Sequence, residues 1–262
     1  MIPKIIHYVW VGDNPKSDLV LKCIDSWKKF CPDYEIIEWG NDKIKDFDNL
    51  YLQQAFDNKK WAFVSDYIRL YALKYYGGLY FDTDLEITNS LDKFLNLQFF
   101  SGFEDYHGVY SPITSAIMGA VKDQKIICDL LDEYKNIPFI RNGICNQTTN
   151  TARITKYFEK NFNVSSPYNP NETIKLTDEC IIYPSYYFCV PQNNKQNYSI
   201  HHFNGSWLDA YKRTIIFSIG NYRIAKFSKR KNEPDAALPL LKNEIILFQF
   251  RFLKYKICLI KY

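Results

Sequence analysis

The hydrophobic pattern near the start of the chain is typical of an α/β protein. Residues 2–10 form an apolar run rich in β-branched side chains, which predicts a buried strand ended by the turn residues 11–15. Residues 17–30 carry apolar side chains three and four positions apart, which predicts a helix, and residues 34–39 predict a second strand. A strand, a helix and a strand in this order favour a mostly parallel central sheet.

The most informative stretch lies between residues 60 and 87. Residues 61–76 predict a helix with almost no fully polar face, and the glycine pair at 77–78 supplies its stop. An apolar strand at 79–81 then runs into the triplet Asp82-Thr83-Asp84. Farther along, the pattern predicts a strand at 99–103, a helix at 116–135 and a surface loop at 161–175.

The charge of the chain is small but unevenly distributed. The 262 residues carry a formal charge of +4, yet residues 223–262 hold ten basic and three acidic side chains, a net +7. Residues 1–222 carry 23 basic and 26 acidic side chains, a net −3. We therefore expect one domain over residues 1–222 and a basic, aromatic C-terminal segment over residues 223–262. Because the excess of cations lies outside that domain, no nucleic-acid partner is expected.

The end of the chain mixes apolar and cationic side chains. Residues 245–262 interleave Phe, Tyr, Ile and Leu with Lys and Arg. Two interpretations are open: the segment binds an anionic membrane surface, or it packs on the domain with its Lys and Arg stems covering apolar surface. Residues 248–252 alternate like a strand and the remainder fits a helix, so the pattern assigns no secondary structure there.

The cysteines and the N-terminus indicate the compartment. Seven cysteines, odd in number and without a CxxC pair, predict neither a disulfide framework nor a zinc site. Residues 1–7 lack the apolar run of a signal peptide, and no stretch approaches the roughly 18 apolar residues of a spanning helix. We therefore expect a cytoplasmic protein, free or peripheral on the inner face of the cell membrane.

The triplet Asp82-Thr83-Asp84 is the first candidate for chemistry. Two carboxylates so close together repel each other unless a cation lies between them, and a hard divalent ion that also contacts phosphate oxygens is the usual solution. The triplet follows a strand, and open α/β folds bind ligands where their strands end. The alternative is a solvated turn, because this spacing is common by chance.

A charged pair precedes the triplet in the predicted helix 61–76. Asp66 and Arg69 lie three residues apart, so both side chains share one face of that helix. Charged groups in so apolar a helix need partners. The two residues are either a structural ion pair or a polar pair in the same cleft as the triplet, where they hydrogen-bond sugar hydroxyls.

Three blocks, in order, resemble the DxD-containing glycosyltransferases. The central block reads Ser65-Asp66-x-x-Arg69-x-x-x-Leu73-x-x-x-Gly77-Gly78-x-Tyr80-x-Asp82-x-Asp84. The first is Ile2-Pro3-Lys4-Ile5-Ile6-His7-Tyr8-Val9-Trp10-Val11-Gly12, and the last is His201-His202-Phe203-Asn204-Gly205-Ser206-Trp207. They are similar to the capsular-polysaccharide family of these enzymes (family 32) and to the glucosylating domains of large clostridial toxins.

The resemblance implies a fold and a reaction. The implied fold is GT-A, a nucleotide-binding α/β sandwich, and the implied activity is a retaining hexosyl transfer that uses Mn²⁺ or Mg²⁺. The donor is a nucleotide-sugar, with a UDP-sugar favoured over a GDP-sugar. The implied acceptor is a saccharide or a lipid-linked glycan in the synthesis of capsule, lipopolysaccharide or another surface glycan.

The resemblance also implies roles for individual residues, carried over by position. Asp84, Asp82 and His202 would hold the metal, with His202 preferred to His201. The catalytic set that contacts the donor sugar would be Asp66, Arg69 and Asp82. Contacts to the nucleotide-sugar are implied for Val9, Trp10, Ser65, Tyr80, Asp82, Ser206 and Trp207.

Neither a nucleophile nor a catalytic base is assigned. Glu86, Glu104 and Asp105 are acidic candidates for a place near the acceptor, and the polar loop at 142–150 either binds sugar hydroxyls or is an ordinary turn. A phosphotransferase of the HAD type also has a strand ending in DxD, but that pattern requires Thr or Val where Glu86 stands. A non-catalytic scaffold that binds nucleotide-sugars is the alternative from a different class.

Overall fold

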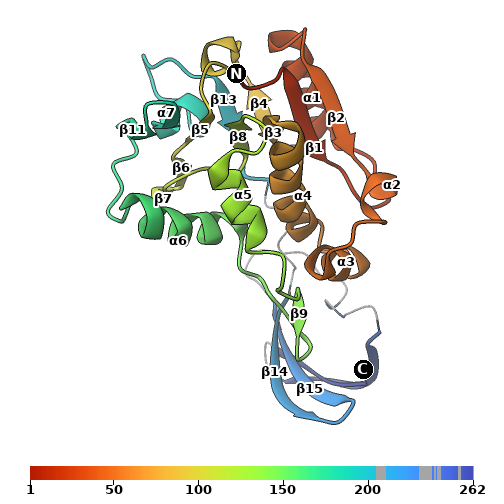
Figure 1. The fold of residues 1–262 in the computed structure, drawn as a ribbon. Coiled ribbons are helices and arrows are strands. Elements are labelled where there is room, and N and C mark those ends of the chain that lie inside the picture. The colour runs from red at the N-terminus through yellow and green to blue at the C-terminus, as the bar shows by residue number, and fades with distance from the viewer. Residues whose placement is uncertain (205–210, 230–237, 239, 241–242, 253–254, 262) are drawn as a thin grey trace.

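The computed structural model describes residues 1–204, 211–229, 238, 240, 243–252 and 255–261. Figure 1 shows an upper body built around a large sheet and a smaller sheet below it that contains the last strands of the chain. No helix in the described ranges is both long and apolar enough to cross a membrane.

Seven strands form the main sheet in the order β11-β12-β5-β8-β3-β1-β2. Their bounds are β1 Ile5–Val9, β2 Glu35–Trp39, β3 Gly78–Phe81, β5 Phe99–Gly102, β8 Ile117–Ala120, β11 Ile174–Thr177 and β12 Cys180–Tyr183. β1 pairs in parallel with β2 and β3, and β5 with β12, whereas β8 is antiparallel to both β3 and β5. β11 is antiparallel to β12. Five of the seven strands therefore run in one direction, and the predicted α/β fold with a mostly parallel central sheet is confirmed.

Helices cover both faces of this sheet. Their bounds are α1 Asp18–Phe30, α2 Asn41–Ile44, α3 Leu50–Asp57, α4 Trp61–Tyr76, α5 Lys125–Asp132, α6 Asn150–Phe162, α7 Ser185–Phe188 and the 3₁₀ helix η1 Asp92–Phe94. Helices α3 to α6 share one buried core with Tyr80, whereas α1, η1 and α7 share another with Leu79 and Phe81. Since neighbouring residues of β3 enter different cores, the strand is buried on both faces.

The turn at Gly77-Gly78 places β3 beside β1. The two glycines have φ angles of +67° and +98°, a region that other residues rarely adopt. A Cβ atom on Gly78 would lie only 2.6 Å from the carbonyl oxygen of Ile5. This close approach fixes β3 next to β1 and carries its carboxyl end, with Asp82, to the same edge of the sheet.

The helix predicted over residues 116–135 is wrong in its first half. Ile117–Ala120 form β8 in the middle of the sheet, and α5 begins only at Lys125, where the side chain of Gln124 caps it. An apolar run this short does not distinguish a buried strand from a turn of helix. Gly119 suits the strand because a Cβ atom there would lie 2.1 Å from the ring of Phe100 on the neighbouring β5.

The C-terminal segment, left unassigned by the sequence pattern, forms antiparallel strands. These are β14 Tyr211–Ile219, β15 Tyr222–Lys229, β16 Ile245–Phe252 and β17 Tyr255–Lys261, in the order β14-β15-β17-β16. The sheet thus begins before residue 222, and the division into 1–222 and 223–262 stays a prediction. Short ladders join β4 Leu85–Ile87 with β13 Ser199–His201, β6 Glu104–Tyr106 with β7 Val109–Ser111, and β9 Ile140–Arg141 with β10 Ile144–Cys145.

Candidate active site

The candidate site lies at the carboxyl edge of the main sheet. β1, β3 and β5 run in the same direction, so the residues that follow them meet at one edge: Trp10 after β1, Asp82 after β3 and Glu104 after β5. This is the edge at which open α/β folds bind ligands. The position expected for the Asp82-Thr83-Asp84 triplet is therefore the one observed.

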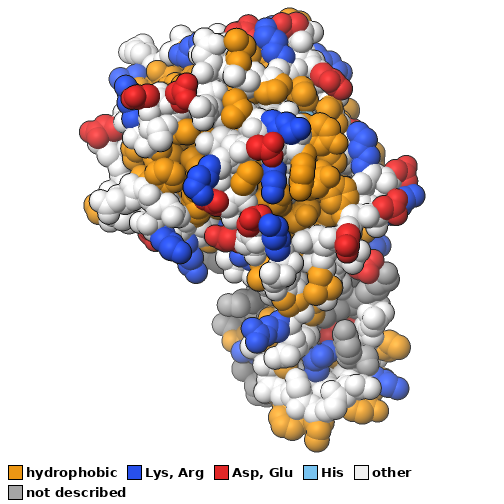
Figure 2. Space-filling view, in the orientation of Figure 1, with side chains coloured by type: hydrophobic (Ala, Val, Ile, Leu, Met, Phe, Trp, Pro, Cys, Tyr) orange, Lys and Arg blue, Asp and Glu red, His pale blue; other side chains and the backbone are white. Residues whose placement is uncertain are grey.

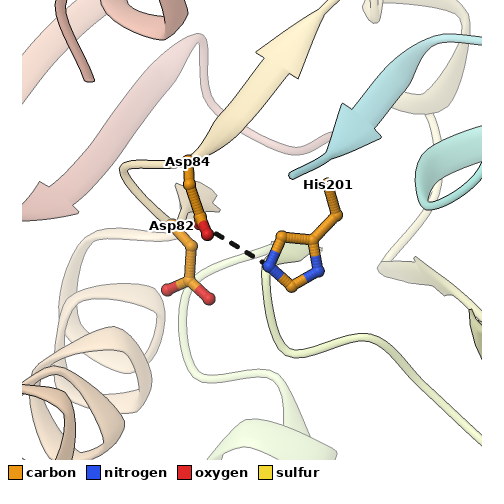
Figure 3. A group of neighbouring side chains, drawn as sticks. All are labelled: Asp82, Asp84 and His201. Atoms are coloured by element: carbon orange, nitrogen blue, oxygen red, sulfur yellow. Dashed lines mark ion pairs between the residues drawn. The ribbon is translucent and has the colours of Figure 1, made fainter. Parts of the chain in front are cut away.

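Two aspartates and one histidine converge at this edge. The ligand atoms of Asp82, Asp84 and His201 all lie within 4.8 Å of one another, and Figure 3 shows them pointing toward a common space. The antiparallel ladder between β4 and β13 pairs Leu85 with His201, which brings a residue from late in the chain beside the triplet. Carboxylate oxygens and an imidazole nitrogen form a donor set that suits Mn²⁺.

The electrostatics of this group favour an ion pair between Asp84 and His201. Burial would raise the pKa of Asp84, but the hydrogen bond from His201 and the backbone N–H of Asn204, 2.9 Å from Asp84 Oδ2, lower it below its usual value. His201 Nε2 lies 3.5 Å from Asp84 Oδ1. Burial lowers the pKa of His201, whereas the Asp84 carboxylate raises it more strongly, to about 10. In the described residues, His201 Nδ1, on the side of the ring away from the two aspartates, is buried without a hydrogen-bond partner.

His201, and not the expected His202, joins the two aspartates. The imidazole of His202 lies instead 2.9 Å from Glu86 Oε2, which also accepts a hydrogen bond from Lys22 Nζ at 2.8 Å. Residue 201 is the last of β13, and side chains of successive residues along an extended chain point to opposite sides. The sequence alone does not distinguish His201 from His202, because the pairing of β13 with β4 determines which imidazole faces the triplet.

Arg69 links the helix α4 to the group formed by Asp82, Asp84 and His201. Its Nη2 atom lies 3.1 Å from Asp66 Oδ1 and 3.2 Å from Asp82 Oδ1, and its Nη1 donates to the carbonyl of Ser115 at 2.7 Å. Both Arg69 and Asp66 are buried, 3% and 7% exposed. Although burial lowers the pKa of Arg69, the carboxylates of Asp82 and Asp66 raise it. The structural ion pair and the site therefore form one network.

Asp66 connects this network to helix α6. Its Oδ2 atom accepts a hydrogen bond from the backbone N–H of Asn150 at 3.1 Å. Burial raises the pKa of Asp66 to about 6, with Arg69 acting in the opposite direction. At neutral pH the carboxylate is therefore ionised and holds the first residue of α6 against α4.

Ser65 and Tyr80 support the same network from its two ends. Ser65 Oγ accepts from Arg69 Nη2 at 2.9 Å, and the hydroxyl of Tyr80 donates to Asp82 Oδ1 at 2.9 Å. The guanidinium carbon of Arg69 lies 4.6 Å from the centre of the Tyr80 ring. Both residues thus orient Arg69 and Asp82, and their predicted contacts to the nucleotide-sugar remain predictions.

The residues expected to hold the nucleobase lie at the end of β1. Val9 is part of the buried core, whereas Trp10 is partly exposed and its indole N–H donates to the carbonyl of Asn14 at 3.2 Å. Trp10 thus lies at the same edge of the sheet as Asp82, and its contact with a nucleobase remains a prediction. Ser206 and Trp207 lie outside the described residues, so the structure does not place them.

Two further residues lie near the site without having been assigned to it. Burial raises the pKa of Glu104 to about 6, and His201 and Asp82 both lie close enough to act on it. Both amide atoms of the Asn150 side chain are buried without a partner in the described residues. In the sequence, Glu104 is one of several acidic candidates and Asn150 is the end of a polar loop. Their burial distinguishes them, and it is visible only in the structure.

Comparison with known proteins bears on the DXD block directly. Residues 17–100 match the family model described as "Glycosyltransferase sugar-binding region containing DXD motif". The resemblance to the DXD glycosyltransferases is confirmed. The three-layer sandwich with its DXD triplet at the carboxyl edge is the GT-A arrangement that this resemblance implied.

Curated relatives agree with the same class of enzyme. An uncharacterized glycosyltransferase of Acanthamoeba polyphaga mimivirus is 27% identical over 237 residues, which cover 86% of this chain and 91% of that protein. Inositol phosphoceramide mannosyltransferase 3 of Schizosaccharomyces pombe is 28% identical over 144 residues, 52% of this chain and 37% of its own. The chain therefore spans nearly all of the viral relative but little more than a third of the yeast one.

Among solved structures, the PaToxG glycosyltransferase is similar over 61% of this chain and 69% of its own. The sequence identity is 21% and the TM-score is 0.47. The fold is assigned from the strand order and strand directions of the chain itself.

Proposed function

We propose that this DXD glycosyltransferase transfers a hexose from a nucleotide-sugar to a saccharide acceptor with retention of the anomeric configuration, and that the reaction depends on Mn²⁺ or Mg²⁺. The observation that carries the proposal is the convergence of Asp82, Asp84 and His201 within 4.8 Å at the carboxyl edge of the sheet. A UDP-sugar is the favoured donor and a GDP-sugar the alternative.

The three converging residues would hold the cation. When bound, the cation supplies positive charge to the diphosphate oxygens of the donor as the bond to the sugar breaks. Asp84 is held ready for this by the backbone N–H of Asn204, and Asp82 by Tyr80 and Arg69. Because these partners are already in place, little reorganisation is needed when the charge develops.

The donor sugar and the base have separate candidate contacts. The Trp10 ring offers a face for stacking on the base. Asp66 and Arg69 are proposed to bind hydroxyls of the donor sugar. The unpaired amide of Asn150, which adjoins Asp66, has both the donor and the acceptor atoms that a sugar hydroxyl requires.

The proposed acceptor is a saccharide or a lipid-linked glycan used in a surface polymer such as capsule or lipopolysaccharide. Two yeast relatives are an inositol phosphoceramide mannosyltransferase and a mannosyl phosphorylinositol ceramide synthase. A membrane-bound acceptor is therefore consistent with this relationship. We place the reaction in the cytoplasm or at the inner face of the cell membrane.

Donor turnover by an Asp84→Asn variant tests the proposal. The substitution keeps the size of the side chain but removes its charge, so we expect kcat for UDP-sugar hydrolysis or transfer to fall by about 10²–10³-fold. Asp178→Asn, in an exposed turn remote from the sheet edge, is the matched control and should retain full activity. EDTA should abolish turnover in the native chain, and Mn²⁺ should restore it.

Two results would contradict the proposal. Full activity of the Asp84→Asn variant, or full activity in EDTA, would remove the metal role. Donor binding measured by calorimetry, without turnover over a broad panel of saccharide acceptors, would instead support the non-catalytic scaffold.

A further inference from the structure

We propose that one face of the C-terminal sheet binds an anionic membrane surface. This inference concerns the four strands β14 to β17, and it goes beyond the proposed function because it does not depend on the transfer reaction. The face, called the open face here, is made of three cross-strand rows. They are Phe217, Ile224, Leu259 and Phe248; Ile219, Tyr222, Lys261 and Ile245; and Thr214, Lys226, Ile257 and Phe250.

The open face is apolar and exposed. Phe217 is 54%, Ile219 65% and Phe248 60% exposed to solvent, although residues of this kind are usually buried. Because the rows run across all four strands, these side chains form one continuous surface instead of scattered contacts. Figure 2 shows separate hydrophobic side chains along the rim of the lower end of the molecule, with Lys and Arg side chains among them.

The C-terminal sheet has its hydrophobic core on the face opposite to the open face. This core is made of Ala225, Phe227, Cys258 and Ile260. Leu238 and Leu240, from the connection between β15 and β16, pack against that core. These two leucines therefore cover part of the inner face, whereas the apolar side chains of the open face are exposed among the described residues.

The charged side chains of the open face favour an anionic partner. The open face contains Lys226 and Lys261, and the described residues of its three rows include no acidic side chain. Glu244 lies buried, with its carboxylate 3.4 Å from Arg223 Nη1, and Arg223 belongs to the inner face. A lipid surface offers an apolar layer for the aromatic rings and anionic headgroups for the ammonium groups at the same time.

A second copy of the chain fits this face less well. Two open faces in contact would bury Lys226 and Lys261 of each copy against apolar side chains and like charges. An ammonium group buried without an anionic partner is costly. At a membrane the same lysines reach the headgroups while their stems stay on the apolar surface. The composition of the face therefore favours lipid over self-association.

Vesicle flotation of the full chain tests the inference. We expect the native protein to float with vesicles of phosphatidylcholine and phosphatidylserine, and to float less with phosphatidylcholine alone. The double variant Phe217→Ser/Phe248→Ser should partition at least about tenfold more weakly onto the anionic vesicles. The matched control is Leu21→Ser/Leu50→Ser, two exposed apolar residues of α1 and α3 that lie on the body, which should float like the native chain.

A charge variant and two further measurements make the result decisive. Lys226→Glu/Lys261→Glu leaves the apolar rows intact, and its flotation should also fall. Donor turnover by each variant reports whether the body has folded, so a loss of flotation with full turnover supports the proposal and leaves the proposed function untouched. Equal flotation of the native chain and the Phe217→Ser/Phe248→Ser variant would overturn it. So would a native chain that does not float but sediments as a dimer that this variant dissociates.

Discussion

The carboxyl edge of the main sheet and the open face of the C-terminal sheet distribute charge and apolar surface in opposite ways. At the edge, Arg69 and Asp66 are buried, and the guanidinium of Arg69 pairs with the carboxylates of Asp66 and of the partly buried Asp82. On the open face, Phe217 and Phe248 remain in water although the sheet already has a core. Each region therefore presents groups that are free to bind a partner. At the carboxyl edge these are carboxylate and imidazole atoms, and on the open face they are exposed apolar side chains.

The largest effect is expected from removing the charge that holds the first region together. Arg69→Met keeps much of the side-chain volume but leaves the carboxylates of Asp66 and Asp82 without their shared cation. Breaking a buried ion pair from one side destabilises a protein by about 3–5 kcal/mol. Urea unfolding should show this loss, whereas Arg141→Met, at an exposed position in β9, should stay within about 0.5 kcal/mol of the native chain. A small loss for Arg69→Met would mean that the network does not stabilise the fold.

A pair of phenylalanine substitutions sharpens the comparison within the small sheet. Phe227 is fully buried in the inner core, so Phe227→Ala should cost about 3–4 kcal/mol. Phe248→Ala, on the open face, should change the free energy of unfolding by less than about 0.5 kcal/mol. Thermal or urea unfolding followed by circular dichroism measures both. Equal losses would show that the open face contributes to the fold and is not free for a partner.

The third prediction concerns His7, a buried histidine of β1 whose two ring nitrogens both have a hydrogen-bond partner. Its Nε2–H donates to the carbonyl of Gly77 at 2.9 Å, and its Nδ1 lies 3.3 Å from the indole N–H of Trp39. Burial lowers the pKa of His7 from 6.5 to about 4, with the charge of Lys43 acting in the same direction. Both nitrogens are thus satisfied only while the ring is neutral.

The pH dependence follows from the direction of that shift. Below pH 6.5 the unfolded chain binds a proton that the folded chain excludes, so stability is fully present above pH 6.5 and is lost as the pH falls toward 4. The loss due to His7 amounts to about 3 kcal/mol. Urea unfolding at a series of pH values should show that difference between the native chain and His7→Phe, and parallel pH curves for the two proteins would refute the assignment.

The smallest effect separates the two neighbouring histidines. His201→Ala removes a proposed metal ligand and should weaken Mn²⁺ binding, measured by calorimetry, by at least about tenfold. His202→Ala removes a partner of Glu86 outside the ligand group, so its Mn²⁺ affinity should stay within about twofold of the native value. A larger loss of Mn²⁺ affinity in His202→Ala than in His201→Ala would instead support His202, the ligand predicted from the sequence, and would contradict the role proposed for His201.

Much of the body was predictable from the sequence because its elements have clear ends. Helix α1 carries buried side chains at Val20, Cys23, Ile24 and Trp27, and Ser17 caps it, so both its period and its start are visible. The Asp66–Arg69 spacing and the Asp82-Thr83-Asp84 triplet likewise depend on local geometry. Residues whose position is decided within one helix or strand can be inferred without the rest of the chain.

The features that the sequence did not predict depend on distant pairings. The strand Ile117–Ala120 is recognisable only beside Phe100, and His201 is selected over His202 only by the ladder with β4. In the C-terminal segment Phe248 and Phe250 alternate with the polar Gln249, yet these phenylalanines lie on the open face, and only the partner strands reveal which face is buried. In each case the deciding contact lies elsewhere in the chain.

The ladder between β4 and β13 also determines when the site comes into existence. All seven strands of the main sheet end by Tyr183, whereas the strand that brings His201 spans Ser199–His201. During synthesis, which proceeds from the N-terminus, the sheet and its aspartates can therefore assemble before the imidazole has emerged from the ribosome. We expect a chain released at residue 198 to retain the sheet yet bind Mn²⁺ more weakly than the full chain, because it lacks the imidazole of His201.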